Sequence, residues 1–348
     1  MCDSNSRLVF FVDSREMRGA QRALLNYAAA NLESGSPTTV VCFGKPKGTE
    51  RFDLVELSSG SILKPQNLLY CLICLLKNDV AVSTIPHVNI VIGFLCLFSY
   101  KTKLIWRESN SVEVSYSRRM FRNIAQVLVW LLKRRISVVI PSRHLEKEYF
   151  SLYPFLRNQI FVVSNGIGFG QWCEAHGRCS LLETGLGSYF VVSLRDAPQK
   201  NVEATLCCSE QLLMTLPHLK CVVLGESAHP MLKRLKKDWG DRFFYKGFVN
   251  DPSLMVSACS FAICLSLEEG NPNFVNEALS LGVPIVLLER PWSREYNSFS
   301  GVFIISDPDP GPIMDELRLC AQSTVTYTRR VDPTWAQQIR KLRDVVDQ

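Results

Sequence analysis

One segment of this 348-residue chain places acidic side chains next to a predicted anion site. The apolar run Phe261–Leu265 predicts a buried strand, and Glu269 and Gly270 follow it closely. Asn271 as N-cap and Pro272 as the first helical residue then predict the start of a helix. The free N–H groups and the positive dipole end of a helix N-terminus attract anions such as phosphate.

The helix predicted after this start runs over about 273–281 and ends at Gly282. Glu277 lies about one and a half turns into it, and Gly270 lets a phosphate approach the backbone closely. Carboxylates beside an anion site are suited to accept hydrogen bonds from the hydroxyls of a sugar or a ribose. An ordinary strand–helix–strand unit with glutamates on its surface is the alternative, which this segment alone leaves open.

Two cations follow another predicted strand, Tyr189–Ser193. Arg195 comes just after the strand, and Lys200 stands where the next helix begins. Two cations at the carboxyl end of a strand can clamp a diphosphate. Two solvated surface charges are the alternative interpretation.

A third candidate is the loop after the first predicted strand, Leu8–Val12. Gly19 in this loop allows a ligand to approach the start of the first helix. The loop lacks the Gly-x-Gly-x-x-Gly pattern of dinucleotide-binding proteins, so it does not by itself indicate a nucleotide.

These candidates lie at the ends of predicted strands that alternate with helices, which indicates parallel sheets. The predicted strands of the first half are Leu8–Val12, Thr38–Phe43, Val80–Thr84, Leu104–Trp106, Val138–Pro141 and Ile160–Val163. Those of the second half are Tyr189–Ser193, Lys220–Leu224, Phe243–Tyr245, Phe261–Leu265 and Pro284–Leu288. Doubly wound sheets bind ligands outside the carboxyl ends of their strands. Two such domains facing each other would form an interdomain cleft.

The pattern of strands and helices is interrupted between Gly168 and Gly187, where glycine recurs and periodicity is lost. We therefore expect two Rossmann-like α/β domains, over residues 1–168 and 169–325, followed by a C-terminal helical tail over 326–348. The tail helix, predicted over 333–346, can pack back on either domain.

Composition excludes several classes of protein. A hydrophobic fraction of 47% excludes a disordered chain. No apolar stretch reaches the roughly 18–20 residues of a membrane span, and the N-terminus does not resemble a signal peptide, so we expect a cytoplasmic protein. Cys71 and Cys74 have metal-ligand spacing, but no second such pair and no nearby His accompanies them. We expect them to pack in a core.

Charge is distributed unevenly along the chain. Residues 1–157 contain 21 Lys and Arg against 12 Asp and Glu, a net charge of +9, whereas the remainder has −3. The basic half contains a predicted amphipathic helix over 117–137, flanked by Arg and Lys. Its apolar stripe consists of Met120, Ile124, Val127, Leu128 and Leu131. Such a helix can lie on an anionic membrane, and the alternative is a domain helix whose stripe faces the core.

The order and spacing of these pieces resemble the GT-B glycosyltransferases of the retaining glycosyltransferase family 4, also called glycosyl transferases group 1. The matching motifs are Glu269-Gly-Asn-Pro-Asn-Phe-Val-Asn-Glu277-Ala, Gly282-Val-Pro284, Arg195 with Lys200-Asn201, Val139–Leu145, Ser164-Asn165-Gly166-Ile167 and Arg18-Gly19-Ala20-Gln21-Arg22. The resemblance covers roughly residues 8–325 and implies a GT-B fold with a nucleotide-sugar donor on the C-terminal domain.

The resemblance also implies roles for individual residues. Arg195 and Lys200 would hold the diphosphate and stabilise its charge as it leaves, and Glu269 would bind the transferred sugar. These three residues are the expected catalytic set. The expected donor-binding set is Gly19, Gly270, Asn271, Pro272, Asn273, Phe274 and Glu277. No metal and no cofactor are expected besides the donor substrate.

One feature of the family is missing. Many members carry a His after a middle strand, near the reacting sugar, whereas this chain has Arg107-Glu-Ser-Asn-Ser111 there. Glu108, Ser109 and Asn110 are therefore assigned to the acceptor side, with Glu108 as the candidate substitute for the His. His87 lies some twenty residues earlier and does not match the family position.

The resulting expectation is a retaining hexosyltransferase that moves a sugar from a nucleotide-sugar to a glycan or lipid-linked acceptor. The pathway expected is biosynthesis of surface polysaccharide, either lipopolysaccharide or capsule. Segment 117–137 would make peripheral contact with the inner face of the cytoplasmic membrane. The alternative is a non-catalytic scaffold of the same fold that binds sugar-nucleotides or glycans. No nucleic-acid partner is expected, because aromatic residues are not interleaved with the basic runs.

Overall fold

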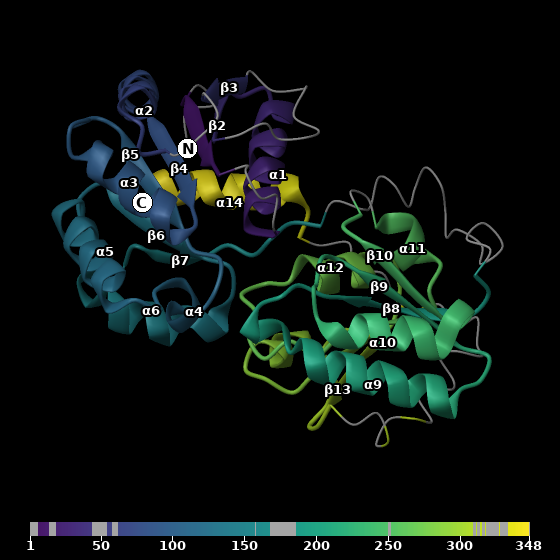
Figure 1. The fold of residues 1–348 in the computed structure, drawn as a ribbon. Helices are drawn as coiled ribbons and strands as arrows, with labels where there is room; N and C mark the ends of the chain where they lie inside the picture. Colours follow the sequence, from purple (N-terminus) through teal and green to yellow (C-terminus); the bar gives the residue numbers. More distant parts are fainter. Residues whose placement is uncertain are drawn as a thin grey trace. The chain divides into compact units, whose positions relative to one another are not determined.

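Each of the two units of the computed structural model is built on one parallel β-sheet (Figure 1). Unit 1 comprises Met1–Gly166 together with Pro333–Gln348, and unit 2 comprises Ile167–Asp332. The structure describes residues 6–13, 19–43, 54–57, 62–156, 158–167, 186–249, 252–308, 311, 314, 317, 327 and 333–347. Residues 14–18 of the first loop, the predicted domain boundary at 168/169 and the predicted start of the tail at 326 lie outside them.

The sheet of unit 1 has the strand order β3-β2-β1-β4-β5-β6-β7, and every neighbouring pair is parallel. Its strands are β1 (Leu8–Val12), β2 (Thr38–Phe43), β3 (Leu54–Leu57), β4 (Val80–Thr84), β5 (Lys103–Arg107), β6 (Ile136–Ile140) and β7 (Ile160–Val162). All residues of β1 and β4 are buried. Burial on both faces is what a parallel sheet between two helical layers requires.

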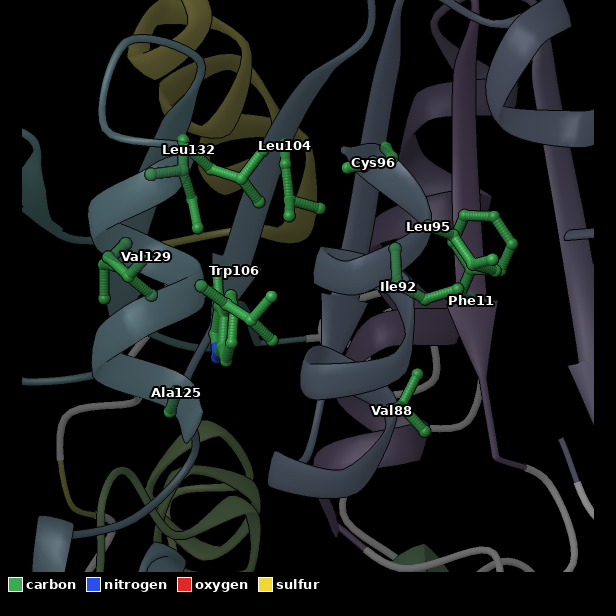
Figure 2. Packing of buried hydrophobic residues seen from close by; sticks show 14 of the residues in the cluster. Phe11, Val88, Ile92, Leu95, Cys96, Leu104, Trp106, Ala125, Val129 and Leu132 are labelled. Atoms are coloured by element: carbon green, nitrogen blue, oxygen red, sulfur yellow. The ribbon is translucent and has the colours of Figure 1, made fainter. Parts of the chain in front are cut away.

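Helices cover both faces of this sheet. On one face pack α1 (Gly19–Glu33) and α14 (Trp335–Asp347). On the other pack α2 (Pro65–Lys77), α3 (Pro86–Cys96) and α5 (Arg119–Leu131), with α6 (Glu146–Leu152) and the short α4 (Val112–Ser115) beside them. Figure 2 shows Ile92 of α3 and Val129 of α5 packing against the layer that contains Trp106 of β5.

The sheet of unit 2 has the strand order β10-β9-β8-β11-β12-β13 and is also parallel throughout. Its strands are β8 (Tyr189–Ser193), β9 (Lys220–Leu224), β10 (Phe243–Gly247), β11 (Phe261–Cys264), β12 (Ile285–Leu288) and β13 (Val302–Ile305). One face is covered by α9 (Val202–Thr215) and α10 (Pro230–Trp239), the other by α11 (Ser253–Ser257) and α12 (Asn273–Ser280).

Both sheets reverse their winding direction once. The reversal, which we call the switch point, lies between β1 and β4 in unit 1 and between β8 and β11 in unit 2. At a switch point the connections leave neighbouring strands toward opposite sides, which opens a crevice outside their carboxyl ends. The two switch points are therefore where side chains with chemical roles are expected.

The last helix completes unit 1. Trp335 of α14 meets the ring of Tyr27 of α1 edge-on at 5.1 Å, and Arg343 Nε donates to Asn31 Oδ1 at 2.8 Å. Gly166 lies so close to this helix that an added Cβ would be 2.6 Å from the Trp335 backbone. The C-terminal residues thus cover a face of the sheet that the N-terminal residues form.

The predicted α/β architecture with two doubly wound parallel sheets is confirmed. The sequence prediction missed the two strands β3 and β13. The predicted core position of Cys71 and Cys74 is confirmed, because both are buried free thiols. Burial raises the pKa of Cys71 to about 12.

Candidate active site at the carboxyl ends of the strands

The switch point of unit 2 carries an ion pair. Lys200 follows β8, Glu269 follows β11, and the Lys200 ammonium donates to Oε1 of the Glu269 carboxylate. The Glu269 side chain is only 8% exposed and that of Lys200 23%. Burial alone lowers the pKa of Lys200, but the charge of Glu269 and its hydrogen bond act in the opposite direction, and the pKa lies above its ordinary value. Lys200 is therefore a fixed cation at the edge of the sheet.

Hydrogen bonds hold the two loops of this pair together. Asn201 adopts a left-handed conformation with φ 49° and donates from Nδ2 to Leu265 O at 3.1 Å. The Leu267 amide donates to Gln199 O at 2.8 Å. Asn is among the few residues that tolerate this conformation, and here it turns the chain from Lys200 into α9. The spacing of Lys200 and Glu269 is thus fixed by the backbone as well as by their charges.

A third loop joins the same edge through Asp196. Its carboxylate accepts from Ser227 Oγ at 2.5 Å and from the Ala228 amide at 2.7 Å. These hydrogen bonds, the Ala228 amide first, hold the pKa of Asp196 below its ordinary value. Asp196 is not among the motif residues, Arg195 and Lys200-Asn201, on which the resemblance rests at this strand end, so the comparison of motifs gave no sign of this tie. Arg195 precedes it and is partly buried.

The start of α12 is built differently from the prediction. Pro272, not Asn271, is the N-cap, and its backbone is extended with φ −68° and ψ 120°. The Asn271 side chain instead enters a three-membered ring of hydrogen bonds with Tyr296 and Asn276. Asn271 Nδ2 donates to Tyr296 OH (3.2 Å), which donates to Asn276 Oδ1 (3.2 Å), and Asn276 Nδ2 donates to Asn271 Oδ1 (2.9 Å). Asn271 is displaced from the cap because this tertiary network uses both ends of its amide.

The remaining predicted donor residues surround this helix start. Gly270 and Pro272 are buried, whereas Asn273, Phe274 and Glu277 are partly exposed along the first turns of α12. The structure thus brings Arg195, Lys200, Glu269 and the start of α12 to one edge of unit 2. Gly19 belongs to unit 1, where it begins α1.

Glu108 lies inside the core of unit 1. It is 0% exposed and accepts from Tyr116 OH at 2.6 Å. Burial raises the pKa of Glu108 to about 7, against the hydrogen bonds from neighbouring aromatic side chains, which lower it. Ser109 and Asn110 are partly exposed, and the Asn110 carbonyl accepts from Tyr149 OH at 2.9 Å. A role of these residues on the acceptor side stays a prediction.

The preceding residue, Arg107, has a structural position. Its guanidinium is buried, donates to Asn165 Oδ1 and lies over the ring of Tyr27 at 5.5 Å. Tyr27 OH donates to Ser164 O at 2.7 Å. Arg107 of β5 and Tyr27 of α1 therefore hold the Ser164-Asn165-Gly166 segment, where the first stretch of unit 1 ends.

Sequence reasoning missed one pair of side chains at the switch point of unit 1. Asp13 follows β1, His87 follows β4, and His87 Nε2 lies 2.8 Å from Asp13 Oδ2. Part of the signal was available, because Asp13 comes directly after the predicted strand Leu8–Val12 and His87 lies three residues beyond the predicted strand Val80–Thr84, in the first turn of α3. No local motif, however, links two residues that are far apart along the chain.

The described residues contain neither a membrane-spanning helix nor a cluster of metal ligands. No helix among them is both long enough and apolar enough to cross a membrane. Within the same part of the chain, no group of three or more His, Cys, Asp or Glu side chains is arranged to hold a metal ion.

Comparison with protein families matches residues 188–322 to the family described as Glycosyl transferases group 1. The matched residues all lie in unit 2, so it is this unit that is similar to the family. A comparison with curated protein sequences finds no match.

Solved structures of similar fold extend over both units. The crystal structure of Anabaena Alr3699/HepE in complex with UDP and glucose has 14% identity and a TM-score of 0.69, covering 99% of this chain and 97% of that one. WaaG, a glycosyltransferase involved in lipopolysaccharide biosynthesis, has 13% identity and a TM-score of 0.63, covering 97% and 95%. UDP-GlcNAc 2-epimerase from Methanocaldococcus jannaschii has 12% identity and a TM-score of 0.61, covering 98% and 100%.

At these identities the likeness establishes the fold, and the predicted GT-B fold is confirmed. The epimerase shows that the fold serves more than one reaction on nucleotide-sugars. The activity must therefore be argued from the site.

Proposed function

We propose that this protein is a retaining glycosyltransferase of family 4 that moves a hexose from a nucleotide-sugar to a glycan or lipid-linked acceptor. The observation that carries the proposal is the Lys200–Glu269 pair at the switch point of the unit that matches the glycosyltransferase family. This is the place where doubly wound sheets bind nucleotides.

The geometry suits the departure of a diphosphate. Lys200 is a fixed cation close enough to Arg195 for their charges to interact, and its partner Glu269 lies just before α12 in the chain. Developing negative charge can therefore meet groups that are already oriented. Glu269 holds Lys200 in place and has further acceptor capacity for a sugar hydroxyl. Similarity to a structure that contains UDP and glucose supports a uridine-diphosphate sugar as the first donor to test.

The test is a donor panel. Purified protein is mixed with UDP-glucose, GDP-mannose, ADP-glucose or dTDP-glucose, and thermal shift and nucleoside-diphosphate release are followed with and without a membrane extract as acceptor. We expect one base class to stabilise the protein and to be released only with the extract. Lys200→Ala should lower release by about 10²–10³-fold, whereas Lys237→Ala, on the exposed side of α10, should not.

Other outcomes distinguish the alternatives. Stabilisation without release, even with extract, would support a binding scaffold. Conversion of the donor sugar to an epimer without transfer would support epimerase chemistry in this fold. Retention is tested by the anomeric configuration of the isolated product, and an inverted linkage would contradict a retaining mechanism.

Contact with a membrane surface is proposed for α5. Most of the predicted apolar stripe does not face the core: Met120, Val127 and Leu131 are each more than half exposed, and Trp130 joins them. The core face is formed instead by Ala125, Leu128 and Val129. Basic residues flank the helix at both ends, so the exposed stripe fits an anionic lipid surface.

The neighbouring helices extend this apolar surface. α3 contacts both α2 and α5, and the three form one layer over the same face of the sheet. Their outer sides expose further large apolar residues, namely Leu69, Ile73 and Leu76 on α2, Phe94 on α3, and Phe98 and Tyr100 just after it. An acceptor at the inner face of the cytoplasmic membrane, such as a lipid-linked precursor of lipopolysaccharide or capsule, is consistent with such a surface.

Sedimentation with vesicles tests the contact. We expect binding to vesicles that contain phosphatidylglycerol and little binding to pure phosphatidylcholine. The double variant Met120→Asp/Val127→Asp should lose binding, whereas Met214→Asp, which changes an equally exposed Met on α9 of unit 2, should keep it. Equal binding of both variants would contradict the proposal.

A further inference from the structure

The connection that follows β12 carries two buried aromatic residues, Trp292 and Tyr296. β12 is the parallel neighbour of β11, so this connection emerges at the same edge of the sheet as the loop 265–272, which carries Glu269. Trp292 is 2% exposed, and Tyr296, the last residue of the 3₁₀ turn Ser293–Tyr296, is 3% exposed. Neither residue belongs to the motifs on which the resemblance rests, yet both contact the loop of the candidate site.

Apolar packing fixes the ring of Tyr296. Trp292 meets it edge-on, with 6.3 Å between the ring centroids, and Phe299 lies against it at 6.1 Å. Trp292 and Tyr296 both belong to the buried cluster on the face of the sheet that α12 covers. Because close-packed interiors leave little room for movement, the Tyr296 hydroxyl group is held at one place.

This hydroxyl group closes the ring of hydrogen bonds with Asn271 and Asn276. It accepts from the Asn271 amide and donates to that of Asn276, which in turn donates to Asn271. Asn271 lies in the loop 265–272 and Asn276 in the first turn of α12, so the hydroxyl ties the loop to the helix. Asn276 is 3% exposed, and a buried amide that loses a partner is costly. The arrangement of loop and helix therefore depends on the phenol.

Trp292 holds the same loop nearer its other end. Its indole Nε1 donates to Ser266 O at 3.2 Å. Glu269 thus lies between two residues, Ser266 and Asn271, that the connection after β12 contacts. Since Glu269 in turn accepts from Lys200, the places of both charged groups depend on this connection.

We infer that Tyr296 is a positioning residue of the donor site in unit 2, an inference that rests on the proposed function. Its hydroxyl acts through Asn271 and holds Glu269 and the start of α12 where the donor binds. Small displacements of binding groups are costly, because the contacts of a site need precise geometry. These contacts are made to the donor both before and during transfer, so their loss raises KM more than it lowers kcat.

The variant that tests this role is Tyr296→Phe, which keeps the packed ring and removes only the hydroxyl group. Turnover is measured with membrane extract and the donor that the panel selects, UDP-glucose being the first. We expect the KM for the donor to rise about tenfold, while kcat changes by less than about threefold. Isothermal titration with the matching free nucleoside diphosphate should show a similar loss of affinity. Values of KM and affinity equal to those of wild type would overturn the inference.

Tyr189→Phe is the matched control. Tyr189 is equally buried and its hydroxyl donates to Met255 O at 2.7 Å, but it is the first residue of β8, at the opposite end from the site. Both variants lose one buried hydroxyl, so both should unfold at somewhat lower urea concentrations than wild type. Only Tyr296→Phe should raise the KM. An equal rise in Tyr189→Phe would mean that general loosening of unit 2 is the cause, and the inference would be wrong.

A double-mutant cycle tests the route through Asn271. Asn271→Ala alone should weaken binding of the nucleoside diphosphate. Adding Tyr296→Phe to it should weaken binding little further, because the hydroxyl acts through that amide. Fully additive effects of the two substitutions would show that Tyr296 does not act through Asn271, which contradicts the inference.

Failure of the proposed function gives a different result. If wild type neither binds a donor nor releases nucleotide, the glycosyltransferase proposal falls and the inference falls with it. If wild type turns over and Tyr296→Phe has the same KM for the donor, only the inference is lost.

Discussion

The two switch points of this molecule occupy the same place in similar sheets, yet they carry different chemistry. In unit 2, Lys200 and Glu269 neutralise each other at short range and both are largely buried. In unit 1, a buried Asp13 holds a half-exposed His87. In each unit, one residue of the pair follows the first strand, β1 or β8. The other follows the strand across the switch point, β4 or β11.

The difference shows what a fold decides and what it leaves to the side chains. The topology supplies one switch point in each unit, and near each a non-glycine residue with positive φ turns the chain, Ile85 after β4 and Asn201 after β8. A cation that is held in place can stabilise an anionic leaving group. An imidazole can instead accept and release a proton. The same topology therefore presents a buried ion pair in unit 2 and a half-exposed imidazole in unit 1.

The largest expected difference between the two pairs is in their contribution to the free energy of unfolding. Lys200→Met leaves Glu269 buried without its cation, and removal of one partner of a buried pair costs about 3–5 kcal/mol. His87→Gln should cost less than about 1 kcal/mol, because the ring is half exposed and Gln can still donate to Asp13. Urea unfolding of both variants measures the difference. Equal losses would show that the two pairs are structurally alike.

A second prediction concerns the buried acid of unit 1. Glu108 has a pKa of about 7 in the folded protein against 4.5 ordinarily. Its stabilising effect is complete below pH 4.5 and is lost as pH rises through about 7, since the folded state binds the extra proton. Glu108→Gln cannot ionise and should gain about 2–3 kcal/mol relative to wild type between pH 5 and pH 8.

Denaturant unfolding at both pH values, with Glu113→Gln on the partly exposed α4 as control, tests this prediction. A difference between Glu108→Gln and wild type that is the same at pH 5 and pH 8 would contradict it. That result would also return Glu108 to consideration as an ionised group with a role on the acceptor side.

The smallest effect is expected where Gly166 contacts Trp335 at the start of α14. A Cβ at residue 166 would lie 2.6 Å from backbone atoms of Trp335, so Gly166→Ala forces the helix to shift. Overpacking of this kind costs about 1–3 kcal/mol. Hydrogen exchange of α14 amides should become faster, whereas Arg340→Ala on its exposed side should leave exchange unchanged. Unchanged exchange in Gly166→Ala would show that the contact between residue 166 and Trp335 can adjust without loosening α14.

Much of the fold could be predicted because buried parallel strands are short, continuous apolar runs. β1, β4 and β9 were predicted with the bounds that the structure gives them. β3 and β13 were missed, and both lie at an edge of their sheet. β13 is a continuous apolar run, Val302–Ile305, so its signal was present and was overlooked, although only Ile305 of this edge strand is buried.

The candidate site could be predicted only where it is continuous in the sequence. The segment from Glu269 to Glu277 forms one turn and one helix, and its position after β11 followed from local signals. The Lys200–Glu269 and Asp13–His87 pairs depend on which strands are neighbours, and that is decided by packing over the whole sheet. The cap at Asn271 was wrong because a tertiary network with Tyr296 outweighs a local preference.

The return of α14 to unit 1 has a consequence for how the protein is made. Ile339, Leu342 and Val345 cover the core on the face of α1, but they are synthesised after all of unit 2. At the usual 5–20 residues per second, translation of Ile167–Asp332 separates the two parts of unit 1 by on the order of ten seconds or more. During that interval the nascent first sheet exposes an apolar face on the ribosome, so the first unit to be synthesised is the last to be completed.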